Sequence, residues 1–226
     1  SRLVKIYPQF KNKFINSGNP RLDFWRKDFK SFFNGKSNKK KYILISSNFD
    51  SVSYISIMEM IKFHEKTGYF KRGLNKNLFK KKLYDSKKMF QRYVKTIKTL
   101  SNKFTDEIFI IRPHPKNNPK KIRDLFKNHK NIEVINYGLT SDLISQAKLV
   151  IHAGCTVGLE SSIRNVPTFA YYPQKLKHGN EIANSFSKKI YKEKRLIENI
   201  YKIKSKKNEI EKKFKNNLIN NRASNL

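Results

Sequence analysis

The chain has 226 residues and a formal net charge of +33, and hydrophobic residues make up 38% of it. That hydrophobic content is enough for a packed core and excludes a disordered polycation, and no apolar run approaches the roughly 20 residues of a membrane-spanning helix. The single cysteine excludes an intrachain disulfide and fits a reducing compartment. We therefore expect a cytoplasmic protein.

The charge has two interpretations. Most of the 50 basic residues are Lys, and Asn, Ile, Phe and Tyr are abundant, as AT-rich codons would give. Compositional drift is one explanation, and a basic module that binds nucleic acid or anionic membrane without doing chemistry is the other. Proteins that recognise bases favour Arg, which is sparse in this chain, so no specific nucleic acid is expected as a partner. A peripheral contact with the inner face of the cytoplasmic membrane fits the charge.

Five short apolar runs are typical of buried parallel strands. They alternate with amphipathic segments, which is the pattern of βαβ units. The sequence therefore predicts an α/β protein with a Rossmann-like parallel sheet flanked by helices. Strands are expected at 42–46, 107–112, 132–136, 148–153 and 167–172, and helices at 85–104, 118–129, 140–147 and 156–165.

Small residues follow the predicted strand 148–153. Gly154, Cys155 and Thr156 stand at its carboxyl end, where parallel α/β sheets bind ligands. Small side chains let the backbone approach an anion, and a helix start offers N–H groups to phosphate. Glu160 lies one helical turn further on, where its carboxylate can accept hydrogen bonds from a ribose. The segment favours a nucleoside diphosphate site, and an ordinary strand–turn–helix is the alternative.

A second polar group ends the predicted strand 107–112. Arg112 and His114 alternate there with two prolines that fix the local backbone. A rigidly held Arg and His favour an anion clamp or a proton donor to a leaving phosphate, and a surface turn with incidental basic residues is the alternative. Asn48 follows the first predicted strand and is expected to face the same crevice.

Four stretches in this order resemble a known family. They are GNPRLD from Gly18, ILISSNFD from Ile43, IIRPHP from Ile110 and VIHAGCTVGLES from Val150. Together they resemble the C-terminal half of bacterial polysaccharide and lipopolysaccharide biosynthesis proteins with the glycosyltransferase-B fold. More distantly, they resemble CDP-glycerol glycerophosphotransferases, capsular Kdo transferases and UDP-N-acetylglucosamine 2-epimerases. The resemblance covers roughly residues 14–175.

The resemblance implies the donor-binding half of a glycosyltransferase, or of a glycerophosphotransferase-like enzyme, whose substrate is a nucleotide diphosphate sugar. The residues from Gly154 to Thr156 would contact the diphosphate, and Glu160 the ribose. Arg112 and His114 would lie near the phosphates and carry catalysis. The full implied donor-binding set is Asn48, Arg112, His114, Gly154, Cys155, Thr156 and Glu160.

The resemblance also implies how the chain is divided. Residues 1–19 are expected to be a crossing segment or remnant of an N-terminal acceptor domain that is missing here. Residues 20–187 would form the nucleotide-sugar-binding domain, with 50–84 as an insertion or lid. Residues 188–226 are expected to be Lys-rich helices. We accordingly expect no transferase turnover by this chain alone.

Two departures sharpen these expectations. The stretch SSNFDS from Ser46 stands where the epimerases have a catalytic His-Arg stretch, which argues against epimerisation. No Asp-x-Asp motif of the other large transferase fold is present, so no cofactor and no divalent metal are implied. The predicted function is nucleotide-sugar-dependent transfer in cell-surface carbohydrate biosynthesis, including capsule and lipopolysaccharide, and the non-catalytic basic module is the alternative.

Overall fold

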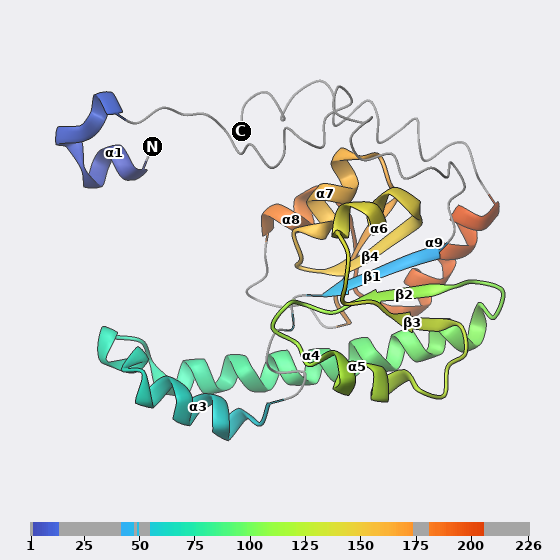
Figure 1. The fold of residues 1–226 in the computed structure, drawn as a ribbon, viewed down its shortest axis with the longest axis horizontal. Coiled ribbons are helices and arrows are strands. Elements are labelled where there is room, and N and C mark those ends of the chain that lie inside the picture. The colour runs from blue at the N-terminus through green and yellow to red at the C-terminus, as the bar shows by residue number, and fades with distance from the viewer. Residues whose placement is uncertain (1, 14–41, 48, 50–54, 174–180, 206–226) are drawn as a thin grey trace.

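A six-stranded parallel sheet forms the centre of the protein in a computed structural model that describes residues 2–13, 42–47, 49, 55–173 and 181–205 (Figure 1). The strand order is β3-β2-β1-β4-β5-β6. This order reverses direction between β1 and β4, so the connections diverge there and leave a crevice at the carboxyl ends of these two strands. The strands are β1 Tyr42–Ser47, β2 Phe109–Arg112, β3 Ile132–Val134, β4 Ala147–Ala153, β5 Thr168–Tyr171 and β6 Lys188–Ile190.

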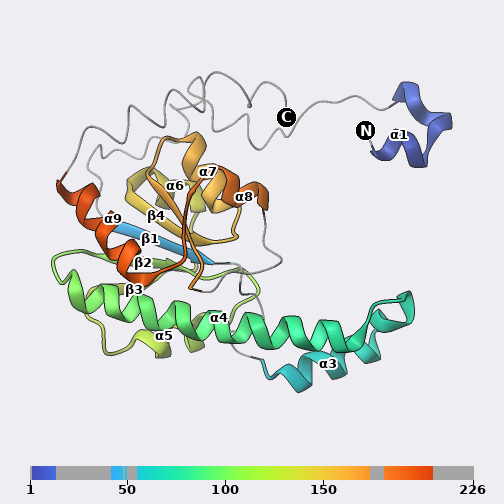
Figure 2. The same cartoon turned by 180° about the vertical axis from the view of Figure 1, so that it is seen from behind.

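Helices cover both faces of the sheet (Figures 1 and 2). One face carries α4 (Lys76–Lys103), α5 (Pro119–Phe126) and α9 (Glu193–Ser205). The other carries α6 (Thr140–Gln146), α7 (Val157–Ile163) and α8 (Glu181–Ser185). The remaining helical elements are α1 Arg2–Ile6, η1 Pro8–Lys13, α3 Ile57–Lys66 and η4 Tyr69–Arg72.

Alternating strand residues build one core on each side of the sheet. Side chains on a strand point to opposite faces in turn, so Ile43 and Ile45 of β1 join the core beneath α4, while Leu44 joins the core beneath α6 and α7. All three are almost fully buried. A parallel sheet covered on both faces needs such continuous apolar strands, and the predicted α/β fold class is confirmed.

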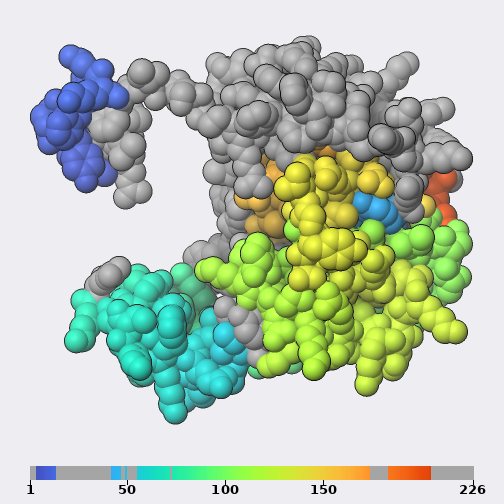
Figure 3. Space-filling view, in the orientation of Figure 1, coloured from blue at the N-terminus to red at the C-terminus, as the bar shows by residue number. Residues whose placement is uncertain are grey.

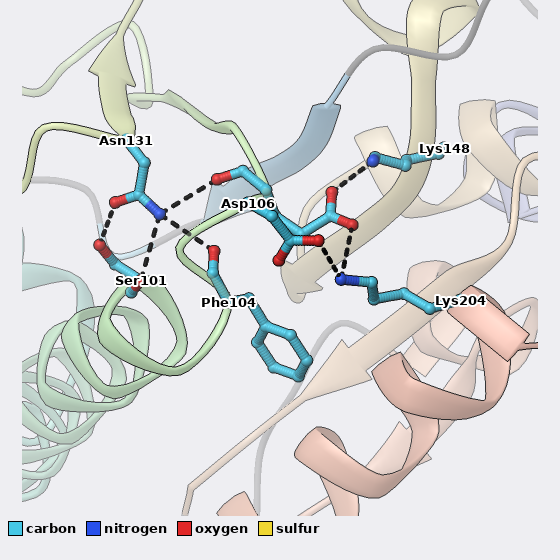
Figure 4. Close-up of polar contacts among 7 residues, drawn as sticks. Ser101, Phe104, Asp106, Asn131, Lys148 and Lys204 are labelled. Atoms are coloured by element: carbon cyan, nitrogen blue, oxygen red, sulfur yellow. Dashed lines mark hydrogen bonds and ion pairs between the residues drawn. The ribbon is translucent and has the colours of Figure 1, made fainter.

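A polar network closes the amino-terminal edge of the sheet (Figure 4). The Asn131 amide donates to the main-chain carbonyls of Ser101, Phe104 and Glu107, at 3.0–3.1 Å. The buried Glu107 carboxylate forms ion pairs with Lys148, at the start of β4, and with Lys204 of α9. These contacts fix α4, β4 and α9 at the edge opposite the crevice.

The sixth strand was not predicted. Residues 188–226 were expected to be helical, and that expectation is wrong at β6, which pairs with β5 in the sheet beyond the predicted boundary at 187. Lys188 and Lys189 are exposed and only Ile190 is buried. A three-residue edge strand of this composition has no apolar run, so periodicity could not find it.

One helix start also differs from the prediction. The helix expected at 85–104 begins at Lys76, where the Asn75 side chain accepts a hydrogen bond from the Leu78 N–H. The helix expected at 140–147 begins at Thr140 as predicted, and its N-cap residue, Leu139, provides no side-chain bond. The segment predicted as an insertion or lid contains α3, η4 and the start of α4. The GNPR stretch lies outside the described residues.

Candidate functional site

A pocket of about 570 Å³ opens at the carboxyl ends of β1, β2 and β4. Each strand contributes a residue at its end or directly after it, because the ends of parallel strands meet at one edge of the sheet. Ser46 comes from β1, Arg112 from β2, and Gly154 directly follows β4. The pocket therefore lies at the point where the strand order reverses.

The turn from β4 into α7 forms one wall of the pocket. Gly154 has a φ of +67°, a left-handed conformation that side chains disfavour, so the turn requires glycine there. The Cys155 Sγ accepts a hydrogen bond from the Ser46 hydroxyl at 3.4 Å, which joins the turn to β1. Thr156 occupies the N-cap position of α7 without a capping side-chain bond.

Glu160 lies at the base of this wall, one helical turn beyond Thr156. It lines the pocket although only 2% of its surface is exposed. Burial lowers the pKa of the neighbouring Arg164 guanidinium, and the carboxylates of Glu160 and Asp142 oppose that shift. A carboxylate thus stands at the pocket floor with a cationic group close behind it.

Arg112 has a structural task in addition to lining the pocket. Its guanidinium donates to the carbonyl oxygens of Ile135, Tyr137 and Gly138, at 3.3, 2.7 and 2.9 Å. Burial lowers the pKa of Arg112, and an arginine remains protonated at neutral pH. These hydrogen bonds hold the loop after β3. Because the carbonyl acceptors are neutral, Arg112 also keeps a positive charge at the pocket.

His114 is fixed by its own turn. Its ring Nδ1 accepts a hydrogen bond from the Lys116 N–H at 3.2 Å, and its backbone N–H donates to the Asn117 side chain at 2.9 Å. A ring nitrogen that accepts carries no proton, so the neutral imidazole has its proton on Nε2. His114 lines the pocket as a side chain able to donate from Nε2.

The structure brings together six of the seven predicted site residues, and the seventh, Asn48, lies outside the described residues. Several other lining residues were missed, among them Asn117, Asn136 and Thr140. Asn136 and Thr140 follow β3, whose carboxyl end meets the same edge. Strand order places them there, and the sequence alone did not give that order.

His152 and Gly158 support the pocket from behind, and sequence reasoning missed both roles. His152 is fully buried, its Nε2 lies 2.8 Å from the Ser187 hydroxyl, and its Nδ1 has no hydrogen-bond partner among the described residues. Burial lowers the pKa of His152 to about 4. A Cβ on Gly158 would lie 2.3 Å from the His152 Nε2, so glycine lets α7 pack against β4.

Within the described ranges, no group of three or more His, Cys, Asp and Glu side chains is placed to hold a metal ion. Over the same part of the chain, no helix has the length and apolar character needed to cross a bilayer.

No family model and no curated protein matches the chain. Solved structures do match, including the Neisseria meningitidis UDP-GlcNAc 2-epimerase bound to UDP-GlcNAc, at 15% identity over 85% of this chain and 44% of that one, with a TM-score of 0.46. The Methanocaldococcus jannaschii UDP-GlcNAc 2-epimerase matches at 17% identity over 88% and 51% of the two chains, with a TM-score of 0.49.

Thermosulfurimonas dismutans KpsC, a beta Kdo 2,7 transferase, matches at 17% identity over 79% of this chain and 49% of that one, with a TM-score of 0.35. These are enzyme classes that the sequence resembles. The chain spans about half the length of the solved structures it matches. At these identities and TM-scores the matches do not place the chain in a family.

Proposed function

We propose that the pocket binds a nucleoside diphosphate sugar and that the chain is the donor-binding half of a glycosyltransferase or glycerophosphotransferase-like enzyme. One observation carries the proposal: six residues from two separate sequence motifs meet in one pocket at the reversal of the strand order. A pocket of about 570 Å³ is within the usual range for small-molecule ligands.

The diphosphate would lie between the two motifs. Gly154 and Cys155 present little side-chain bulk, so the backbone can approach an anion closely. Arg112 supplies a positive charge from the opposite wall, and its anchored guanidinium needs no reorganisation when the anion arrives. The Thr156 hydroxyl, which makes no capping bond, would donate to a phosphate oxygen.

The ribose would lie over Glu160. A carboxylate accepts hydrogen bonds from two adjacent hydroxyls, and charged hydrogen bonds of this kind contribute roughly 1.5–3 kcal/mol each. The position of Glu160 at the pocket floor, one turn into α7, separates it from the proposed phosphate positions near Gly154.

Catalysis in this site would consist of stabilising the negative charge that develops on the departing diphosphate. Arg112 supplies the charge, and His114 donates from Nε2 to a leaving phosphate oxygen. The proposal involves neither a metal ion nor a cofactor, and the base that activates the acceptor would belong to a separate acceptor domain. The biological setting that we propose, from the motif resemblance, is cell-surface carbohydrate assembly in the cytoplasm.

Base selectivity tests this function against the non-catalytic basic module. UDP, CDP, GDP and ADP are titrated into the chain over a range of salt concentrations, with inorganic polyphosphate as the comparison ligand. A nucleotide pocket predicts that one base is preferred and that the preference persists as salt rises. Equal binding of all four nucleotides and polyphosphate, falling together with salt, would contradict the proposal and support a polyanion binder.

A further inference from the structure

A helical hairpin projects from the sheet domain and takes no part in the pocket. We define the α3–α4 hairpin as residues 55–88, which include α3, η4 and the first half of α4. The 28 residues of α4 span about 42 Å, whereas the seven residues of β4 span only about 23 Å. The helix therefore overruns the carboxyl edge of the sheet, and Figures 1 and 3 show the hairpin as a projection beyond it.

The inner side of the hairpin is packed and continues the core that lies beneath α4. Ile57, Ile61 and Leu83 are buried, and the Phe79 ring contacts those of His64, Tyr69 and Phe70 at centroid distances of 4.9–5.5 Å. An ion pair from Glu65 to Lys76 joins the end of α3 to the start of α4. A capping box of Ser56 and Glu59 fixes the first turn of α3. These buried side chains, ring contacts and the ion pair hold α3 against the start of α4.

Large apolar side chains remain on the outside of the hairpin. Phe63 is 63% exposed, Met58 55% and Leu78 50%, and Leu74 and Tyr84 are also exposed. The hairpin interior does not need these side chains, because other residues fill it. Exposed apolar side chains gathered on one projection indicate an interaction surface.

The hairpin that carries these apolar side chains is strongly basic. The hairpin has ten Lys and Arg against three Asp and Glu. Two of the three acids are engaged within it, Glu59 in the capping box and Glu65 in the ion pair with Lys76. The exposed lysines include Lys80, Lys81 and Lys82, on consecutive positions of α4. The surface is both basic and apolar.

We propose that the α3–α4 hairpin docks on an anionic lipid surface. Lysines near such a surface are attracted to its negative headgroups, and apolar side chains between them insert into the boundary with the acyl chains. This combination favours lipid over nucleic acid, because Met and Leu side chains gain by leaving water at the acyl boundary and do not stack on bases as aromatic rings do. The hairpin has nine Lys and one Arg, whereas base and phosphate recognition favours the Arg fork.

The charge also disfavours a second copy of the chain as the occupant, because two such surfaces would repel each other. The hairpin extends beyond the same sheet edge at which the pocket opens. Docking would therefore hold the pocket mouth next to the lipid surface. The inference does not depend on the proposed nucleotide site.

Vesicle flotation with the 226-residue chain tests the docking surface. Vesicles of phosphatidylcholine alone are compared with vesicles that also contain phosphatidylglycerol, and we expect binding to the anionic vesicles only, weakening as salt rises. The variant Lys80→Gln, Lys81→Gln, Lys82→Gln should bind about a hundredfold more weakly, since each lysine contributes about fivefold. The matched control Lys189→Gln, Lys192→Gln, Lys194→Gln removes the same charge from β6, the connection after it and α9, and should bind like wild type.

The apolar contribution is tested by Phe63→Gln with Leu78→Gln, against Ile108→Gln with Tyr191→Gln as exposed apolar controls outside the hairpin. At high salt, where charge attraction is screened, the hairpin double variant should lose the remaining vesicle binding. The control double variant should keep it. Equal losses of vesicle binding in the hairpin and control variants would mean that the overall charge of the chain causes binding, and would overturn the proposal. Failure of the wild-type chain to bind anionic vesicles would also overturn the proposal. Hairpin variants that still bind vesicles but no longer bind a single-stranded oligonucleotide would overturn it as well. Unchanged circular dichroism and urea unfolding in the variants show that the fold is intact.

Discussion

Replacing Gly158 by Ala tests how α7 is held against the sheet. The added Cβ would lie 2.3 Å from Nε2, 2.4 Å from Cε1 and 2.7 Å from Cδ2 of His152. The imidazole cannot turn aside, because it is fully buried and its Nε2 lies within hydrogen-bonding distance of Ser187. We expect α7 to move away from β4 by about 1 Å, since ordinary carbon contacts are near 3.5 Å or more.

The free energy of unfolding should fall by roughly 1–5 kcal/mol. Overpacking of a core contact costs about 1–3 kcal/mol, and a weakened buried hydrogen bond from His152 to Ser187 costs about another 1–3 kcal/mol. The higher helix propensity of Ala offsets about 1 kcal/mol of this loss. Glu160 moves with α7, so nucleotide affinity should fall as well.

Urea unfolding followed by circular dichroism measures the loss. The informative control is the same substitution in a His152→Ala background, where the ring that causes the clash is absent. There, Gly158→Ala should be neutral or stabilising by up to about 1 kcal/mol. An equal loss in both backgrounds would refute the steric reasoning.

Three further predictions concern residues around the pocket. Arg112→Lys should reduce stability by about 1–3 kcal/mol and weaken diphosphate binding, because Lys cannot reproduce the forked hydrogen bonds to the loop after β3. Thermal unfolding and titration measure this, and Arg195→Lys on α9 is the control. Stability should also fall with acid: the folded pKa of His152 is about 4 against 6.5 unfolded, so its contribution is complete above 6.5 and is lost as pH falls toward 4. About 2 kcal/mol should be lost between about pH 7.5 and about pH 5, and His152→Asn should remove this part of the pH dependence. Gly154→Ala should cost about 1–2 kcal/mol from its left-handed conformation and should hinder diphosphate binding. Wild-type affinity in that variant would refute the close approach.

The sheet could be predicted because its strands are buried on both faces. Runs such as those around Ile43 and Val150 are continuously apolar, which only a covered parallel strand requires. The edge strand β6 could not be predicted, because two of its three residues are exposed lysines. The start of α4 was missed for a related reason: residues 76–82 include four lysines, and Phe79 alone among them packs against the core, so they carry no apolar stripe.

The sequence could predict only those pocket residues that lie in a recognisable motif. Arg112 was predicted because it ends an apolar strand, and Glu160 because it lies in the helix that follows an apolar strand and a turn of small residues. Asn136 was missed, since its contribution depends on β3 lying next to β2, and a single sequence does not contain the strand order. His152 appeared to be part of the predicted strand, and its packing against Gly158 became visible only once α7 was placed in space.

The most direct test of the central claim is calorimetric titration of a nucleoside diphosphate and its 2′,3′-dideoxy analogue into wild type and Glu160→Gln. Glu133→Gln, an exposed acid on β3, is the matched control. We expect Glu160→Gln to weaken binding of the ribose ligand by about tenfold or more, from the loss of charged hydrogen bonds of roughly 1.5–3 kcal/mol. The dideoxy ligand should bind wild type and Glu160→Gln equally, and Glu133→Gln should match wild type throughout. Equal affinity of wild type and Glu160→Gln for the ribose ligand would contradict the account.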